Sequence, residues 1–162
     1  MVKKHKIALF LKPDNAYKRI KKSESLTISM NPEEVTYDYI ADETPTTEVD
    51  KYNPSIDQDL TMYKGEEDYE MIFPYFYEMK TGSDAHVSCM VVFMQEEASG
   101  GGYKAWETDS VISVQDLNAV DKKLNFKVLF GGTIKKGIAT VVDEVPTFTE
   151  NGAAKASNTS SK

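Results

Sequence analysis

The first part of the chain alternates apolar and polar residues, which predicts β-strands. Residues 26–30 (Leu-Thr-Ile-Ser-Met) and 35–39 (Val-Thr-Tyr-Asp-Tyr) both repeat with a period of two. The Asn-Pro-Glu-Glu segment at 31–34 is typical of a turn, so we expect the two strands to form a hairpin across it. Before them, the apolar run at 7–11 ends at a Pro-Asp-Asn cluster and predicts a strand followed by a loop.

The alternation stops between residues 42 and 64, where Pro and Thr interrupt it and apolar residues are sparse. A connection of this length is long for a compact domain, in which connections have a median of about 4–6 residues. We therefore predict a functional or mobile loop at 42–64. Part of it, residues 55–63, could form an edge strand.

Residues 66–81 change to the period of a helix. Five side chains spaced at i, i+3, i+4, i+7 and i+8 share one face, which we predict to be the core face: Tyr69, Ile72, Phe73, Phe76 and Tyr77. Acidic residues in the first turn suit the helix dipole, and Gly82 suits the left-handed stop. Pro74 removes a backbone hydrogen bond and predicts a bend.

Strand patterns return after the helix. The segments 87–94, 103–117, 124–130 and 138–142 are apolar or alternating, and the last two predict a closing antiparallel hairpin. The fold class that follows is mainly β with one α-helix. We expect a β-sandwich or half-barrel of antiparallel strands, with the amphipathic helix on its flank.

These patterns divide the chain into three parts. Residues 1–22 form a basic arm with the first strand, 23–148 form one β-sandwich domain, and 149–162 are small and polar, which predicts a disordered tail. The apolar run at 7–11 is far shorter than the ~20 residues of a membrane span, so we expect no membrane partner. One cysteine forms no internal disulfide, which fits folding in a cytoplasm.

Charge is unevenly distributed along the chain. Residues 1–22 carry eight Lys or Arg and one acid (+7), whereas the other 140 residues carry 11 bases and 25 acids (−14). An acidic body disfavours nucleic-acid binding, because phosphate contacts need clustered Lys and Arg. The basic arm could be solvated, could bind nucleic acid, or could attract the acidic body of a neighbouring copy.

The sequence offers few residues for catalysis or metal binding. His5 and His86 are the only histidines, and in a strand His86 and Cys89 fall on opposite faces, so a thiol–imidazole pair is not expected. Asp57 and Asp59 lack the glycine and distal glutamate of a calcium loop, so we interpret them as solvated edge charges. We predict a protein that is not an enzyme and has no cofactor or metal.

Two segments point to a known family. Lys64-Gly-Glu-Glu-Asp-Tyr69, which leads into Phe76-Tyr-Glu-Met-Lys-Thr-Gly82, and the hairpin at 124–140 follow early strands and a long loop. In this order and in these segments the chain resembles the major tail tube proteins of long-tailed, siphovirus-like phages. The resemblance covers roughly residues 20 to 148.

The resemblance implies a structural virion protein, assembled in the host cytoplasm, whose hexameric rings stack into the tail tube. DNA would pass through the lumen without specific binding, and tape measure and tail terminator proteins would be further partners. The long loop and the N-terminal arm would contact the adjacent ring. The candidate ring-to-ring contacts are Glu48, Val49, Tyr52, Ile56, Asp57, Asp59, Leu60, Lys3, Lys4 and Lys6.

Two alternatives remain open at the level of sequence. A monomeric ligand-binding β-barrel would use the aromatic helix face and Trp106 to line a pocket. A tube protein of a contractile tail or secretion system would share the fold of the first hypothesis.

Overall fold

The computed structural model describes residues 1–151. It contains one α-helix, α1 (Glu67–Tyr77), and two 3₁₀ turns, at Lys4–Lys6 and Gly82–Ala85. The strands of the described part are β1 (Ile7–Lys12), β2 (Lys18–Arg19), β3 (Ser23–Ser29), β4 (Pro32–Tyr37), β5 (Thr46–Tyr52), β6 (Ser55–Thr61), β7 (His86–Glu97), β8 (Tyr103–Asn118), β9 (Lys123–Phe130), β10 (Lys135–Val142) and β11 (Val145–Glu150). The predicted mainly β class with one helix is confirmed.

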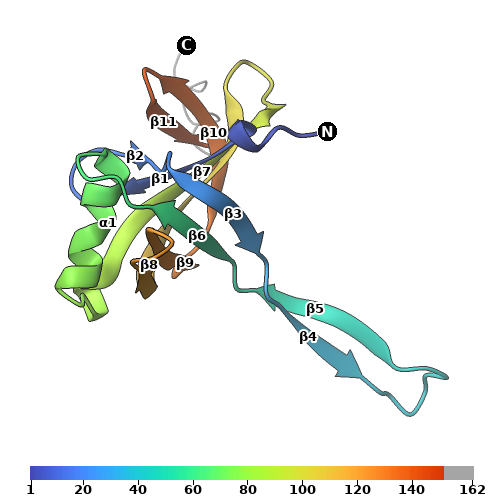
Figure 1. The fold of residues 1–162 in the computed structure, drawn as a ribbon. Helices are drawn as coiled ribbons and strands as arrows, with labels where there is room; N and C mark the ends of the chain where they lie inside the picture. The colour runs from blue at the N-terminus through green and yellow to red at the C-terminus, as the bar shows by residue number, and fades with distance from the viewer. Residues whose placement is uncertain (152–162) are drawn as a thin grey trace.

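One curled antiparallel sheet forms the body, with the strand order β2-β1-β7-β8-β9-β6-β3. Strand β8 also pairs through its first residues with β10, which carries β11. A separate two-stranded sheet, β4–β5, projects from the body as a long hairpin (Figure 1). The sheet and its flanking helix therefore form the predicted half-barrel.

The central strands β1 and β7 are buried on both faces. Successive side chains of a strand point to opposite sides, so Leu9 and Leu11 of β1 join one core cluster while Ala8 and Phe10 join the other. Strand β7 alternates in the same way. Double-sided burial explains why these segments are continuous apolar runs rather than alternating ones.

The helix covers one of the two cores, but with a different face from the predicted one. Its buried residues are Asp68, Met71, Ile72 and Tyr75. Of the predicted face, Ile72 is buried and Phe76 packs half-buried on the core, whereas Tyr69 and Phe73 are half-buried and Tyr77 is 73% exposed. The core face is therefore corrected by one position, to the row 68, 71, 72 and 75.

Asp68 explains this orientation. It is only 3% exposed, and its Oδ2 accepts the backbone N–H groups of Lys21 (3.0 Å) and Lys22 (2.8 Å) just after β2. A buried carboxylate needs such donors, and they are available only where the helix turns Asp68 toward the sheet. The hydrogen bonds thus fix the rotation of α1 about its axis.

The helix also ends earlier than the sequence predicts, at Tyr77 rather than near residue 81. Met79 adopts a left-handed conformation (φ 49°), and the Lys80 N–H donates to the Tyr75 carbonyl at 3.4 Å. This is the Schellman pattern that closes helices, and here it uses Met79 in place of Gly82. Pro74 lies within the last turn of the helix.

The early strands pair differently from the predicted hairpin. Residues 26–29 of β3 pair with β6, and β4 pairs with β5, so the chain continues from β3 into β4 instead of reversing at 31–34. The reversal occurs between β4 and β5. The predicted loop at 42–64 is therefore wrong in most of its length, because it contains β5 and β6.

Strand β6 lies between β3 and β9, so it is an interior strand rather than the edge strand expected at 55–63. Strand β11 extends to Glu150, which is inside the segment expected to be a tail. Residues 152–162 of that segment lie outside the described residues. Among the described residues, no helix has the length and apolar character needed to cross a membrane.

The second core lies under the β10–β11 hairpin, and Gly137 of β10 is a point of close approach. A Cβ at this position would lie 2.2 Å from the Thr149 carbonyl oxygen and 2.7 Å from the ring of Phe148. We predict that Gly137→Ala forces β11 away from β10 and lowers the free energy of unfolding by about 1–3 kcal/mol. Chemical denaturation measures this loss.

Gly132→Ala is the matched control for this substitution, because its added Cβ would meet nothing closer than Asp109 Cβ at 3.7 Å. It should change the stability by no more than about 0.5 kcal/mol. Equal stability of the two variants would contradict the close approach at Gly137.

A second prediction concerns Asp68. Asp68→Ala leaves the N–H groups of Lys21 and Lys22 without their acceptor, so we expect a loss of about 2–3 kcal/mol in unfolding free energy by urea titration. Asp68→Asn keeps one acceptor oxygen and should lose less. Glu67→Ala, an exposed carboxylate in the same turn, is the control and should remain near wild type. A stable Asp68→Ala would refute the role assigned to this carboxylate.

Candidate subunit interfaces

The sheet has two free edges on one four-stranded part, β8–β9–β6–β3. Strand β7 pairs with β8 only as far as Val111, so residues 112–118 of β8 pair with β9 alone. At the other side, β3 pairs only with β6. Within residues 1–151, both edges therefore lack a neighbouring strand. Unpaired edges are the usual place where another chain adds a strand.

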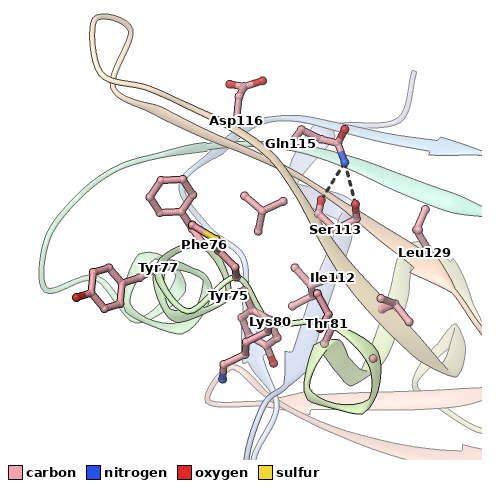
Figure 2. Close-up of a pocket in the computed structure, with 15 residues that line it drawn as sticks. Tyr75, Phe76, Tyr77, Lys80, Thr81, Ile112, Ser113, Gln115, Asp116 and Leu129 are labelled. Carbon is pink, nitrogen blue, oxygen red and sulfur yellow. Dashed lines mark hydrogen bonds between the residues drawn. The ribbon is translucent and has the colours of Figure 1, made fainter.

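A groove of about 750 Å³ runs along the free edge of β8. The last turn of α1 forms one wall and residues 112–116 of β8 form the other, and the 3₁₀ turn after Thr81 closes one end (Figure 2). Gln115, at a bulge in β8, donates through Nε2 to the Ser113 carbonyl (3.2 Å) and to Ser113 Oγ (2.9 Å). This groove was not predicted from the sequence.

Aromatic side chains form a continuous stripe on the outer side of α1. Phe73 lies at its centre, with ring centroids 5.5 Å from Tyr69, 6.0 Å from Phe76 and 6.0 Å from Tyr77. Phe76 and Tyr77 also line the groove. The helix residues that the sequence assigned to the core therefore include the apolar wall of a surface groove.

The β4–β5 hairpin is exposed along its whole length. Both strands have almost only exposed residues, and the turn between them presents Tyr39 at 59% and Ile40 at 108% exposure. The ring of Tyr39 stacks on Tyr37 with centroids 5.7 Å apart. Glu33 and Lys51 form an ion pair of 3.2 Å near the base. The hydrogen bond from Asn53, with that from Lys51, holds the pKa of Glu33 below its usual range.

The predicted ring-to-ring contacts fall into three groups in the structure. Glu48, Val49 and Tyr52 lie exposed on β5 of the hairpin. Ile56 and Leu60 are 0% exposed and belong to the core under α1, so they leave no side-chain surface for a neighbouring ring. These two residues are therefore corrected from contact residues to core residues. The third group consists of Asp57 and Asp59 on β6 and of the N-terminal lysines Lys3, Lys4 and Lys6.

Asp57 and Asp59 lie on the polar face of β6, opposite Ile56 and Leu60, and each has a lysine partner on β9. Asp57 Oδ1 is 3.7 Å from Lys127 Nζ, and Asp59 Oδ1 is 3.8 Å from Lys123 Nζ. Lys123 also pairs with Glu24 at 2.8 Å. The hydrogen bond from Lys123 lowers the pKa of Glu24. These acids are thus members of a cross-strand charge network rather than solvated edge charges.

That network continues across the sheet. Asn125 of β9 donates to Asp116 of β8 at 2.8 Å, and Ser113 of β8 lies opposite Lys127 in register. On this outer face the acids of β6 therefore lie beside the lysines of β9, and Asp116 of β8 accepts a hydrogen bond from Asn125. Lysines held in this way are less available to an external phosphate.

One of the N-terminal lysines, Lys4, lines a cleft of about 280 Å³ between the first 3₁₀ turn, β2 and the start of β3. Lys3 and Lys4 are exposed and Lys6 is half-buried. Lys4 and Arg19 line the cleft with Lys21, which forms an ion pair with Glu144. The hydrogen bond to Glu144 raises the pKa of Lys21.

The residues considered for chemistry do not form a catalytic or metal site. Cys89 is buried, and burial raises the pKa of its thiol, which disfavours the reactive thiolate. His86 is on the exposed side of β7, where it lies 3.1 Å from Asp109. Among residues 1–151, no three His, Cys, Asp or Glu side chains are grouped as metal ligands would be.

Trp106 lies apart from the helix groove. It packs edge-on against Phe93, with centroids 5.0 Å apart, and lines a different groove that includes Lys136 and Ile138 of β10. The aromatic helix face and Trp106 therefore do not line one common pocket. The ligand-binding alternative required such a pocket.

Comparisons with known proteins identify the fold. No family model matches the sequence, and no curated protein matches it. A chain from the tail of an empty gene transfer agent (GTA) particle, determined by helical refinement with C6 symmetry, has a TM-score of 0.57 at 12% identity, over 83% of this chain and 97% of that chain. A chain from the virion of the native GTA particle has a TM-score of 0.58 at 12% identity, over 84% of this chain and 98% of that one. The chain thus shares the fold of these particle proteins.

Proposed function

We propose that the chain is a non-enzymatic tail tube subunit, without cofactor, that assembles into hexameric rings stacked as a conduit for DNA. The observation that carries the proposal is the pair of free edges on the four-stranded part β8–β9–β6–β3. The shared fold with a chain of a C6-symmetric GTA tail supports the same assignment. The more general role that we infer, a structural protein of a tail-type particle, rests on the same two points.

The strand directions suit closure into a ring. Neighbouring strands of this part are antiparallel throughout, so β8 and β3 at its two edges run in opposite directions. If copies are related by rotation, β3 of one copy would lie antiparallel to residues 112–118 of β8 in the next. An even number of strands per copy keeps the alternation unbroken around a closed sheet, which removes every edge.

The groove beside β8 supplies space for this contact. Its volume of about 750 Å³ lies between the free edge and the last turn of α1, and its apolar wall contains Phe76 and Tyr77. A strand that enters here would gain backbone partners from β8 and apolar contact from the helix. This explains why aromatic side chains are placed on the outside of a helix.

The polar outer face of the same four strands is suited to the lumen. Asp57, Asp59 and Asp116 are acids on this face, and its lysines Lys123 and Lys127 are engaged by them or by Glu24. DNA phosphates would meet paired lysines and additional carboxylates, so they would not be held. Passage without specific binding follows from that charge pattern.

The β4–β5 hairpin and residues 1–22 are proposed as the ring-to-ring contacts, with Glu48, Val49 and Tyr52 on the hairpin. Tape measure and tail terminator proteins are the proposed partners inside and at the end of the tube, and no membrane takes part. Assembly would occur in the host cytoplasm, with the virion tail as the final location. A tube of a contractile tail or secretion system has the same requirements for edges and hairpin.

Negative-stain electron microscopy and light scattering at rising concentration test the proposal directly. The wild-type chain should form rings or hollow tubes. A strictly monomeric particle at all concentrations, also in the presence of the other tail proteins, would contradict it.

A substitution in the groove gives a sharper prediction. Thr81→Trp places a large side chain at the end of the groove beside β8 and should block the neighbour's strand. We expect the variant to stay folded but to need about tenfold more protein for ring formation, which corresponds to ~1.4 kcal/mol per contact. Light scattering measures the shift.

Thr147→Trp is the matched control, since Thr147 is also exposed but lies on β11, away from the groove. It should assemble like wild type. Normal rings from Thr81→Trp would rule out the groove as the lateral contact.

A further inference from the structure

We propose that the tip of the β4–β5 hairpin of one copy docks into the cleft between the N-terminal turn, β2 and β3 of a second copy. The inference deepens the proposed function, because it names the surface that receives the hairpin when rings stack. It rests on the shape and charge of two surfaces of this chain.

The hairpin is the acidic partner. Residues 32–52 contain seven carboxylates and one lysine, a formal charge of −6. Lys51 pairs with Glu33, and among the described residues the other six carboxylates have no ion-pair partner. Asp38, Asp42 and Glu43 are near the exposed Ile40 in the sequence of the tip. The tip thus presents an exposed apolar side chain together with several carboxylates.

The cleft is the complementary basic partner. Its apolar lining comes from Ile7, Ile20 and Leu26, and its cations are Lys4, Arg19 and Lys21. Lys21 forms an ion pair with Glu144, and Glu24 of the cleft forms one with Lys123. These two paired charges therefore leave the net charge of the cleft positive. The guanidinium of Arg19 donates to the His5 carbonyl at 3.2 Å and keeps its charge and its other donors.

The N-terminal segment carries further cations besides those that line the cleft. Lys3, Lys6, Lys18 and Lys22 belong to the same N-terminal segment, and within the described residues none of them forms an ion pair with an acid. The segment 1–22, at +7, thus provides an excess of positive charge for a surface of −6. The cleft combines apolar side chains with cations, and the hairpin tip combines an apolar side chain with anions. The two surfaces are therefore complementary in both hydrophobicity and charge.

The two surfaces cannot meet within one subunit. The cleft lies at the start of β3, whereas the hairpin continues beyond the end of β3 and points away from the body (Figure 1). The contact is therefore between different surfaces of two copies. A heterologous contact closes into a ring or propagates along an axis, according to the rotation between the copies, and stacking needs the second case.

Charge reversal tests the pairing. A cleft variant, Lys4→Glu with Arg19→Glu, and a tip variant, Asp42→Lys with Glu43→Lys, should each raise the concentration needed for stacking by about tenfold or more, because like charges then face each other. The four substitutions in one chain should restore stacking. Lys135→Glu with Lys136→Glu on β10 makes the same change of charge away from the cleft and should behave like wild type. Stacking that ignores both variants overturns the proposal.

Disulfide trapping tests the contact without the need for tubes. Ile40→Cys with Ser25→Cys puts one thiol on the tip and one in the lining of the cleft, and oxidation should give a ladder of covalent oligomers. The native Cys89 is buried and does not contribute. Ile40→Cys with Val120→Cys, whose second thiol is exposed on the β8–β9 turn, should give far less of this ladder, because the proposed docking does not bring its two thiols together.

The two readouts separate the two proposals. A ladder from a chain that forms no rings would support the docking and refute the hexameric tube. Tubes from wild type, with no ladder from the variant that combines Ile40→Cys with Ser25→Cys under the same conditions, would support the tube and refute the docking.

Discussion

The backbone of β8 is the constraint on which the rest of the structure depends. This strand of 16 residues must satisfy hydrogen bonds on both sides, and it does so with a succession of partners, β10 and β7 along its first half and β9 along its second. Because β7 begins with His86 opposite Val111, one side of the second half of β8 stays unpaired. The groove, the free edge and the bend of the sheet around the helix-covered core all follow from this change of partners.

Several polar residues of this chain act through partners from distant segments. Asp68 sets the rotation of α1 through two backbone donors, and Asp57 and Asp59 engage lysines across strands. Charges of opposite sign are concentrated in two segments, negative on the hairpin and positive in residues 1–22. The chain therefore presents surfaces of opposite charge at two separate places.

Sequence reasoning located most strands and the helix because these depend on local periodicity. It failed where a distant partner decides the outcome. The face of α1 depends on donors from Lys21 and Lys22, which no helical pattern contains, and the Asn-Pro at 31–32 is compatible with a turn or with continuation into β4. The sequence suggested that the acids of β6 are solvated charges of an edge strand. Their lysine partners on β9 are more than 60 residues away in sequence, so a local pattern does not reveal them. The β8 groove depends on where β7 begins, which composition does not record, whereas the charge asymmetry was visible from the residues alone.

The neck of the hairpin has a mechanical consequence. Where β3 passes into β4 and β5 into β6, Asn31 Nδ2 donates to the Asn53 carbonyl (3.1 Å) and the Asn53 N–H donates to the Met30 carbonyl (3.1 Å). These hydrogen bonds join the two chain segments that connect the β4–β5 hairpin to the main sheet. A force applied at the tip of the β4–β5 hairpin would therefore act mainly on these two connecting segments. A filament assembled as proposed would therefore curve by bending at the connections between each hairpin and its sheet, while the sheets themselves would keep their shape.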